Sequence, residues 1–364
     1  MPSLRAVTVL LALTMGSYCA NAQTPAYTVQ IVPDPPVPAG FPHPQRDPNL
    51  VLPDGRFVIS HGYDNGAPGQ QFIGNENGWA TPTPLPGYDR AWISDVAANG
   101  DMLGSSINAP DTSRPTLWQG GQAIDLAPQL VPGALVSAMN ASGTITGIVP
   151  TSGDSTYQPF TWSGGATTLL SVPQGYTTAS AVATNIHGLT IGTAGSEAPR
   201  PVVWDLGVPT MLPVPEGDLW SVWMGGVNDS GWVVAHLLYH NGPSGTYLWR
   251  NGERELLEEF WFPWPPMVSN TGDVLINDEL GPCVWRDGTI YRMGDLQTPG
   301  FDGQVEWLHK MLNDGRVLGW VSVDGVMHNA VFTPIPAPAT LSLMAFVALV
   351  SHRRRRSAPR VHHL

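Results

Sequence analysis

The stretch MNASGTITGIVPTSGDSTYQPFTWSGG, residues 139–165, decides the fold, because its pattern recurs along most of the chain. Asn140 and Gly143 are spaced as in a hairpin turn, where Asn tolerates left-handed backbone and Gly takes positive φ without strain. Residues 144–149 alternate small polar with apolar side chains, as a half-buried strand does. An aromatic segment around Trp162 and a glycine-rich turn follow. The stretch predicts short strands joined by tight turns.

The turn glycine of this unit recurs at spacings of 45, 43, 45, 43, 41 and 43 residues. The glycines are Gly55, Gly100, Gly143, Gly188, Gly231, Gly272 and Gly315. An Asn or Asp precedes each of them, in order Asp54, Asn99, Asn140, Asn185, Asn228, Asn270 and Asn313. Seven units with a period near 43 residues are typical of a repeat architecture.

One large aromatic residue follows each turn, in order Phe72, Trp118, Trp162, Trp204, Trp249, Trp285 and Phe332. We assign these residues, the five tryptophans above all, as structural anchors, because a ring buries a large apolar area where neighbouring sheets stack. A unit of this length holds about four short strands, as a blade of a β-propeller does, whereas leucine-rich repeats are shorter. Residues 49–334 are therefore predicted to form an all-β, seven-bladed propeller.

The two ends of the repeat region predict how the ring closes. The last unit runs into the tail after its anchor strand, residues 330–333, without a fourth strand. Residues 27–32 alternate and are β-branched, so they form a strand that precedes the first unit and has no partner there. We expect this strand to complete the last blade, which leaves no open sheet edge. An open stack of units is the alternative.

Composition and charge narrow the class of protein. The 364 residues include 40 Gly and 36 Pro, only 13% are charged, and no stretch keeps a helical apolar period. The formal net charge is −12, but between the arginines of the two ends the body holds 11 basic and 29 acidic residues, a formal −18. Such a surface repels phosphate backbones, so nucleic acid is excluded as a partner, while neutral polymers or multivalent cations fit. The acidity also fits a role in solubility alone.

Cysteine usage excludes two further features. Cys19 lies in the leader, which leaves Cys283 alone in the mature chain. An intrachain disulfide therefore cannot form, and a cysteine-based zinc site would need more ligands.

The unit resembles the HAF repeat of bacterial extracellular repeat proteins, roughly Ile-Asn-x-x-Gly-x-Val-x-Gly followed by an aromatic-x-Trp strand. Residues 139–147 with Phe160 and Trp162 match it best, and residues 227–233 with Trp249 match it next. The His-Ala-Phe triplet of the family name is absent. The resemblance covers residues 50–333 and implies a secreted, propeller-like repeat protein with no particular activity.

The N-terminal end has the pattern of a secretory signal peptide. Arg5 supplies the positive region, residues 6–15 are apolar, and residues 20–22 form a small-x-small cleavage site. We expect residues 1–22 to be removed. Residues 23–48 then hold the closing strand and a proline-rich connection.

The C-terminal end, residues 335–364, resembles the PEP-CTERM sorting signal that exosortases recognise. Pro336 and Pro338 precede an apolar run at 341–350, which is too short to span a bilayer comfortably. The arginine cluster follows at Arg353, Arg354, Arg355 and Arg356. Ala337 stands where the family has Glu. The resemblance implies an exosortase-like processing enzyme as partner, transient membrane contact of the tail, and a destination outside a bacterial cell or on its surface. A plain membrane anchor is the alternative.

No residue is assigned a catalytic, cofactor-binding or metal-binding role. His236 and His240 fall on an expected strand, where residues four apart lie roughly 13 Å from each other and cannot share a metal. The pairs at 258–259 and 278–279 are acidic residues beside turns, and the sequence does not show whether two carboxylates reach the separation that a glycosidase needs. The Asn/Asp-Gly turns lack the aspartate spacing of calcium loops.

Aromatic residues beyond the anchors are the candidate binding residues. Trp220 and Trp223 precede the fifth hairpin, while Trp261 and Trp264 lie in the segment FWFPWP before the sixth. Exposed, they could stack on sugar rings or on a partner protein. The alternative is that they fill a blade interface or the channel mouth.

The sequence thus predicts a secreted, surface-sorted propeller that acts as a non-enzymatic binding or matrix module for a polysaccharide or surface protein. The alternative is a propeller hydrolase or lyase acting on extracellular polysaccharide. Converging carboxylates at one channel mouth would favour the enzyme, and an aromatic patch would favour binding.

Overall fold

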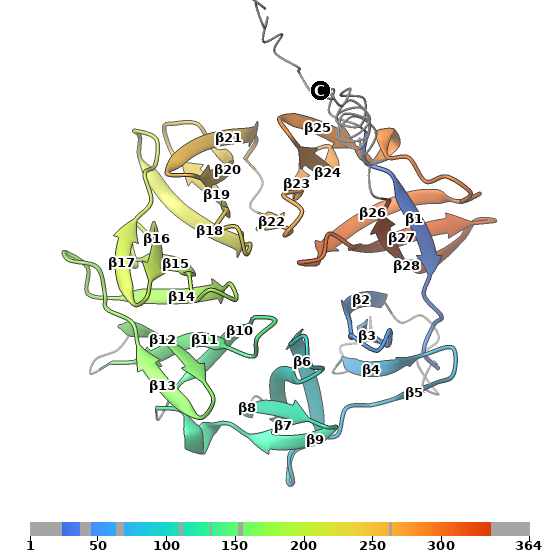
Figure 1. Ribbon diagram of the computed structural model, residues 1–364, viewed down its shortest axis with the longest axis horizontal. Helices are drawn as coiled ribbons and strands as arrows, with labels where there is room; N and C mark the ends of the chain where they lie inside the picture. Colours follow the sequence, from blue (N-terminus) through green and yellow to red (C-terminus); the bar gives the residue numbers. More distant parts are fainter. Residues whose placement is uncertain are drawn as a thin grey trace, which may run out of the picture.

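The structure is a computed structural model that describes residues 24–36, 45–62, 69–108, 112–131, 133–151, 156–261 and 264–335; the side chains of 45–48 and 112 are not described. The described residues form seven four-stranded antiparallel sheets arranged as a ring (Figure 1). The predicted seven-bladed propeller is confirmed. The expected signal peptide and the sorting-signal residues, Pro336, Pro338 and Arg353–Arg356, lie outside the described residues.

The blades follow one another in chain order. Blade 1 holds β2 (Gln45–Val51), β3 (Phe57–Gly62), β4 (Gln70–Asn75) and β5 (Gly78–Ala80); blade 2 holds β6 (Arg90–Val96), β7 (Met102–Asn108), β8 (Thr112–Gln119) and β9 (Gln122–Asp125). Blade 3 holds β10 (Leu135–Met139), β11 (Ile145–Pro150), β12 (Tyr157–Ser163) and β13 (Ala166–Leu169); blade 4 holds β14 (Ala179–Thr184), β15 (Thr190–Ala194), β16 (Arg200–Asp205) and β17 (Val208–Met211).

The remaining blades have the same plan. Blade 5 holds β18 (Leu219–Val227), β19 (Val233–Tyr239), β20 (Gly245–Arg250) and β21 (Glu253–Glu259); blade 6 holds β22 (Met267–Val268), β23 (Val274–Asp278), β24 (Gly281–Arg286) and β25 (Thr289–Arg292). Blade 7 combines β26 (Gln304–Met311), β27 (Val317–Val323) and β28 (Val326–Pro334) with β1 (Tyr27–Ile31). Two short 3-10 helices, η1 (Ala127–Gln129) and η2 (Met293–Asp295), follow the outer strands of blades 2 and 6.

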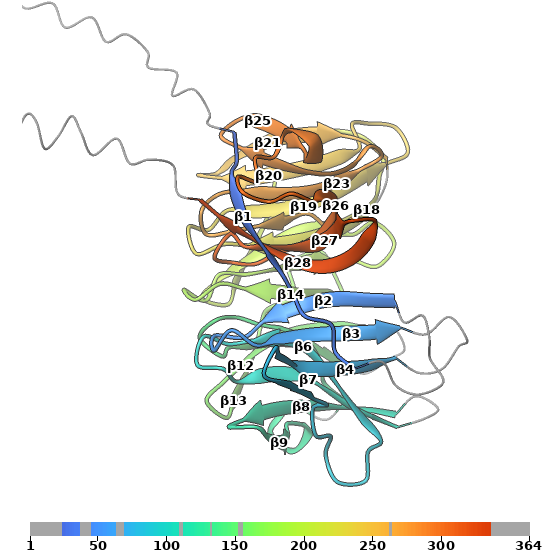
Figure 2. The same cartoon turned by 90° about the vertical axis from the view of Figure 1, so that its right-hand side faces the viewer.

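The ring closes through β1 as predicted. This strand pairs antiparallel with β28, with Gln30 opposite Val331, and completes the sheet in the order β1-β28-β27-β26. Figure 2 shows β1 running along β28 at the side of the ring. Tyr27 is buried and meets Phe332 edge-on, with ring centroids 6.4 Å apart. The first and last strands of the described propeller therefore share one core.

The anchor tryptophans lie between consecutive blades. Trp162, for example, is buried in one cluster with Leu103 and Leu117 of blade 2 and Ile145 of its own blade. Three anchor indoles, those of Trp118, Trp204 and Trp249, donate a hydrogen bond of 2.7–2.8 Å to a backbone carbonyl 33–36 residues earlier. Each such bond ties the third strand of a blade to the segment that enters the blade.

The hairpin asparagines of blades 3 to 5 join neighbouring blades. Asn140 donates through Nδ2 to the carbonyl of Asn185 at 2.7 Å, and Asn185 donates in the same way to Asn228 at 3.0 Å. Asn228 continues to the carbonyl of Ser269 at 2.9 Å. The Oδ1 atoms accept backbone N–H groups of their own turns. We call these three residues the asparagine belt.

The first repeat begins earlier than expected. The proline-rich connection was predicted to continue through Pro48, but β2 starts at Gln45 and contains this proline. The pairing of β2 with β3 shifts register between Pro48 and Leu50, and β2 is the innermost strand of its sheet. A proline is tolerated on an edge strand or at a bulge, because its missing N–H breaks no ladder there.

Candidate functional site

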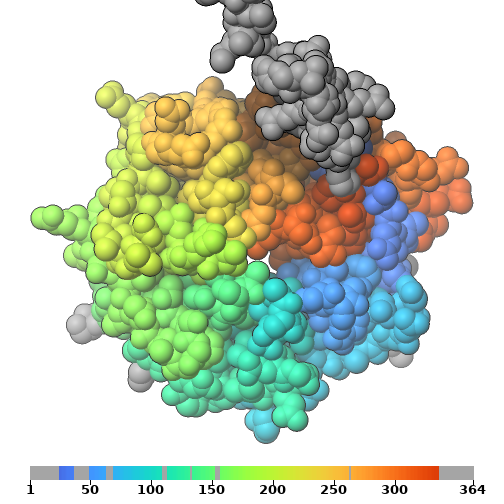
Figure 3. All heavy atoms as spheres, in the orientation of Figure 1, coloured from blue at the N-terminus to red at the C-terminus, as the bar shows by residue number. Residues whose placement is uncertain are grey.

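The central space of the ring is lined by the innermost strands, β2, β6, β10, β14, β18, β22 and β26. Viewed along the ring axis, the blades close around a narrow centre (Figure 3). Four blades carry a tryptophan at the same repeat position, eight residues before the turn glycine: Trp92, Trp223, Trp264 and Trp307. The other three blades have Asp47, Leu135 and Ser180 there. Alignment of the turn glycines is a sequence signal that reveals this repetition, although Trp92 and Trp307 were not among the predicted binding residues.

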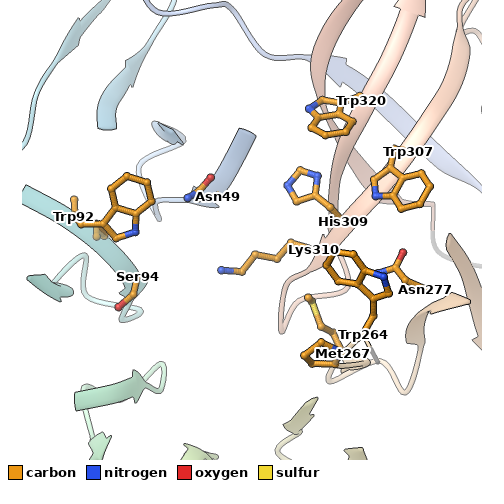
Figure 4. A pocket seen from close by; sticks show the side chains of 12 residues that line it. Asn49, Trp92, Ser94, Trp264, Met267, Asn277, Trp307, His309, Lys310 and Trp320 are labelled. Carbon is orange, nitrogen blue, oxygen red and sulfur yellow. The ribbon is translucent and has the colours of Figure 1, made fainter. Parts of the chain in front are cut away.

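Three of these indoles, those of Trp92, Trp264 and Trp307, line a cavity of about 500 Å³, which we call the tryptophan cavity. Figure 4 shows Trp92 on one side of the open space and Trp264 and Trp307 on the other. Trp320 of β27 adds a fourth indole and lies 5.7 Å from the ring of His309. Polar groups come from Asn49, Ser94, Asn277, His309 and Lys310.

Asn277 brings an unsatisfied acceptor to the tryptophan cavity. It lies on β23 opposite Pro282, is only 6% exposed, and its Oδ1 has no hydrogen-bond partner. A buried polar atom without a partner is costly, so a donor supplied by a ligand would be favoured here.

Lys310 is the only lysine of the chain and lies on β26. Its amine extends into the open space in Figure 4. A second cavity of about 260 Å³, the turn-side cavity, also contains Lys310 and Met267, together with Asp95 and Met139. Lys310 therefore lies where the two cavities meet.

The charges of Lys310 and Asp95 influence each other without forming an ion pair. Burial raises the pKa of Asp95 to about 6, against the opposing effects of Lys310 and of the Met139 N–H, which donates to its carboxylate at 3.3 Å. Burial lowers the pKa of the Lys310 ammonium, and Asp95 opposes that shift in part. Both shifts have the same cause, because burial in the narrow centre of the ring disfavours the charged form of each group.

The four aromatic residues expected to bind a ligand do not form one site in the structure. Trp264 belongs to the tryptophan cavity, and Trp223 shares its repeat position but does not line the cavity. Trp220 and Trp261 lie elsewhere: Trp220 stacks on His240 at 5.6 Å and meets Trp261 at 6.3 Å. All four side chains are 41–50% exposed.

One member of each acidic pair noted in the sequence binds an arginine. Arg292 donates hydrogen bonds to Asp278 and, at 3.1 Å, to Glu258.

Within the described part of the chain, no group of three or more His, Cys, Asp or Glu side chains could hold a metal ion. No helix there is long and apolar enough to cross a membrane. The thiol of Cys283 is buried, and burial raises its pKa to about 12.

Comparisons with solved structures find the same fold. An oligogalacturonate lyase from Vibrio parahaemolyticus is 8% identical with a TM-score of 0.51, covering 86% of this chain and 98% of its own. The propeller domain of the trilobed protease from Pyrococcus furiosus is 9% identical with a TM-score of 0.50, covering 85% and 96%. No family model and no curated protein matches the chain. These likenesses place the chain among β-propellers and show the fold alone.

Proposed function

We propose that the protein is a non-enzymatic binding module that holds an extracellular polysaccharide at the tryptophan cavity. The observation that carries the proposal is the tryptophan at one repeat position in four blades, three of them lining a single cavity. Indole faces pack against the apolar faces of sugar rings. The hydroxyl groups at the edge of the sugar ring then stay free to bond polar partners such as Asn277 and Asn49. The acidic body of the chain favours a neutral polymer.

The small number of carboxylates that line the cavities favours binding of a polysaccharide over its hydrolysis. Among the described residues that line the two cavities, Asp95 alone carries a carboxylate. Glycosidases in general need two carboxyl groups flanking the scissile bond. Binding without cleavage is therefore our preferred function, and the hydrolase or lyase alternative becomes an outcome of the test.

The test is a glycan array probed with the mature chain and scored for retention and for released products. Trp264→Ala and Trp307→Ala should each weaken binding by about 5-fold to 150-fold, the effect of losing an aromatic contact of about 1–3 kcal/mol. Trp220→Ala is the matched control for Trp264→Ala, because the two side chains are similarly exposed and Trp220 lies outside the cavity.

Three outcomes would contradict the proposal. Equal losses for Trp220→Ala would move the site to the outer aromatic group, and cleaved products would make the protein an enzyme. If the chain binds a surface protein and no glycan, its partner is a protein and not a polysaccharide.

We further propose that the chain is secreted through residues 1–22 and sorted to the cell surface by an exosortase-like enzyme acting on the tail. The support is the sequence pattern of the two ends. Mass spectrometry of surface material from the native host should find no peptide beyond about Pro338. Abundant peptides from residues 357–360 would favour a retained anchor instead.

A further inference from the structure

Lys310 occupies an unusual place for a lysine. Lysines are mostly exposed and solubilising, yet the only one in this chain lies in the centre of the ring, where two cavities meet. Its side chain is half-buried, and the amine extends into the open space of the tryptophan cavity (Figure 4). A lysine kept for solubility would not be at this position.

The described walls of the two cavities place both apolar and polar side chains around Lys310. Among the described residues, Lys310 forms no hydrogen bond and no ion pair. The titratable groups that face it from the described walls of the two cavities are Asp95 on β6 and His309 on β26. Four indoles and Met267 form much of the apolar wall of the tryptophan cavity, and Asn49, Ser94 and Asn277 add uncharged polar groups. The half-buried ammonium form is thus only partly hydrated and has no direct counter-ion among the described residues.

This setting favours the free amine, which is the nucleophilic form of lysine. Burial without a direct partner lowers the pKa of Lys310, and buried lysines of this kind act as nucleophiles toward carbonyl groups. We propose that Lys310 is a reactive amine that forms a Schiff base with the aldehyde or ketone group of a small compound in the tryptophan cavity.

The proposed step balances without an oxidant or reductant. The Lys310 nitrogen adds to the carbonyl carbon, a proton moves from nitrogen to oxygen, and the carbinolamine loses water to leave a carbon–nitrogen double bond. Hydrolysis reverses the step and releases the compound. Asp95 is the one carboxyl group among the described residues that line the two cavities.

The cavity also defines the class of compound. A volume of about 500 Å³ admits a molecule of a few carbons, and the indoles with Asn277 Oδ1 suit one that carries hydroxyl groups. A polyhydroxy aldehyde or ketone, such as the open-chain form of a sugar, fits both conditions. The proposal goes beyond polysaccharide binding and does not depend on it.

The single lysine makes the test direct. The mature chain is treated at pH 7 with glycolaldehyde and sodium cyanoborohydride, which traps a Schiff base as a stable secondary amine, and the adduct is located by peptide mass. The folded chain should be modified at Lys310 severalfold faster than the chain unfolded in urea, because a lowered pKa leaves a larger share of the amine unprotonated at pH 7. The N-terminal amine is an internal reference in both samples.

The dependence on pH and a second variant separate a reactive amine from one that is merely accessible. The rate at Lys310 should reach half its maximum well below pH 10.4, the usual pKa of lysine. Asp95→Asn removes the negative charge that opposes the shift, so the midpoint should move further down. Lys310→Arg should retain the fold by circular dichroism and lose the adduct at this position.

Modification of Lys310 no faster in the folded chain than in urea would overturn the proposal, as would a midpoint at the ordinary value. Neither result requires a variant to fold. Glycan binding is measured in the same preparations. Retained glycan binding without the adduct would reject the reactive amine alone, and an adduct without glycan binding would reject the polysaccharide alone.

Discussion

At the scale of single residues, His236 is a fully buried polar group that lies outside the two cavities. It lies on β19, is fully buried beside Phe260 at 4.5 Å between ring centroids, and neither ring nitrogen has a hydrogen-bond partner. Burial lowers its pKa to about 4, so the imidazole is neutral in the folded chain at neutral pH.

This burial predicts a loss of stability in acid. The unfolded chain protonates His236 near pH 6.5 and the folded chain only near pH 4, so the contribution of the neutral imidazole is complete above about pH 6.5 and is lost between these values. The loss should reach about 3 kcal/mol. Asp95, with its raised pKa, acts in the opposite direction below pH 6, so a comparison with a variant is needed.

His236→Phe provides that comparison, because it keeps an aromatic ring beside Phe260 and cannot take up a proton. Urea melts of both proteins at pH 7 and pH 4.5 should show a smaller drop in the free energy of unfolding for the variant. Equal drops would mean that other groups cause the acid sensitivity.

At the scale of elements, the asparagine belt adds a connection that the sequence did not predict. The Asn-x-x-Gly pattern predicted hairpins, and hairpin formation already explained each asparagine locally. The bond from Nδ2 to the next blade depends on how the blades pack, and no feature of one repeat encodes it. The anchors differ in this respect, because a large ring at a fixed repeat position needs burial wherever the blades meet.

The belt should make Asn140 more important than an ordinary turn residue. Asn140 is buried and forms hydrogen bonds through both side-chain atoms, so Asn140→Ala should cost about 2–4 kcal/mol. Asp54→Ala, at an exposed turn where the carboxylate bonds only Arg56, should cost about 1 kcal/mol or less. Trp162→Ala, which empties a buried site, should cost about 3–5 kcal/mol.

Denaturant melts of the three variants measure these costs. If Asn140→Ala costs no more than Asp54→Ala, the bonds between blades contribute little. A negligible loss for Trp162→Ala would contradict its burial in the core.

At the scale of the whole molecule, the repeat period and the pairing of the first strand with the last blade were predictable from the sequence. The tryptophan cavity at the centre of the ring was not. The period of about 43 residues and the orphan strand predicted seven blades and their closure, because both follow from local patterns. The tryptophan cavity combines Trp92, Trp264 and Trp307, which lie as far as 215 residues apart in the chain. Only the curvature of the closed ring brings them together, and hence three of the four proposed binding residues lie outside the cavity that we now consider the site.

Ring closure predicts that the two ends stabilise each other. Deleting residues 24–33 would remove Tyr27 from the core of blade 7 and leave the edge of β28 unpaired. The shortened chain should melt far below the intact one and aggregate, because an unpaired strand is a template for pairing between molecules. A truncation after Ile335 should leave the melt unchanged. A harmless N-terminal deletion would contradict the closed ring.

An engineered disulfide tests the same pairing without removing any residue. Thr28 and Thr333 lie opposite each other in the register of β1 and β28, and both are exposed, so Thr28→Cys with Thr333→Cys should disturb the core little. Directly opposed residues of antiparallel strands have Cα atoms about 4.5–5.5 Å apart, within disulfide reach. The crosslink would close a loop of 305 residues and stabilise the chain by about 5 kcal/mol at most. Thermal melts before and after reduction measure this gain in one protein, and the buried Cys283 should stay unmodified. A double variant that fails to oxidise, or that melts alike in both states, would mean that β1 does not hold the ring closed in solution.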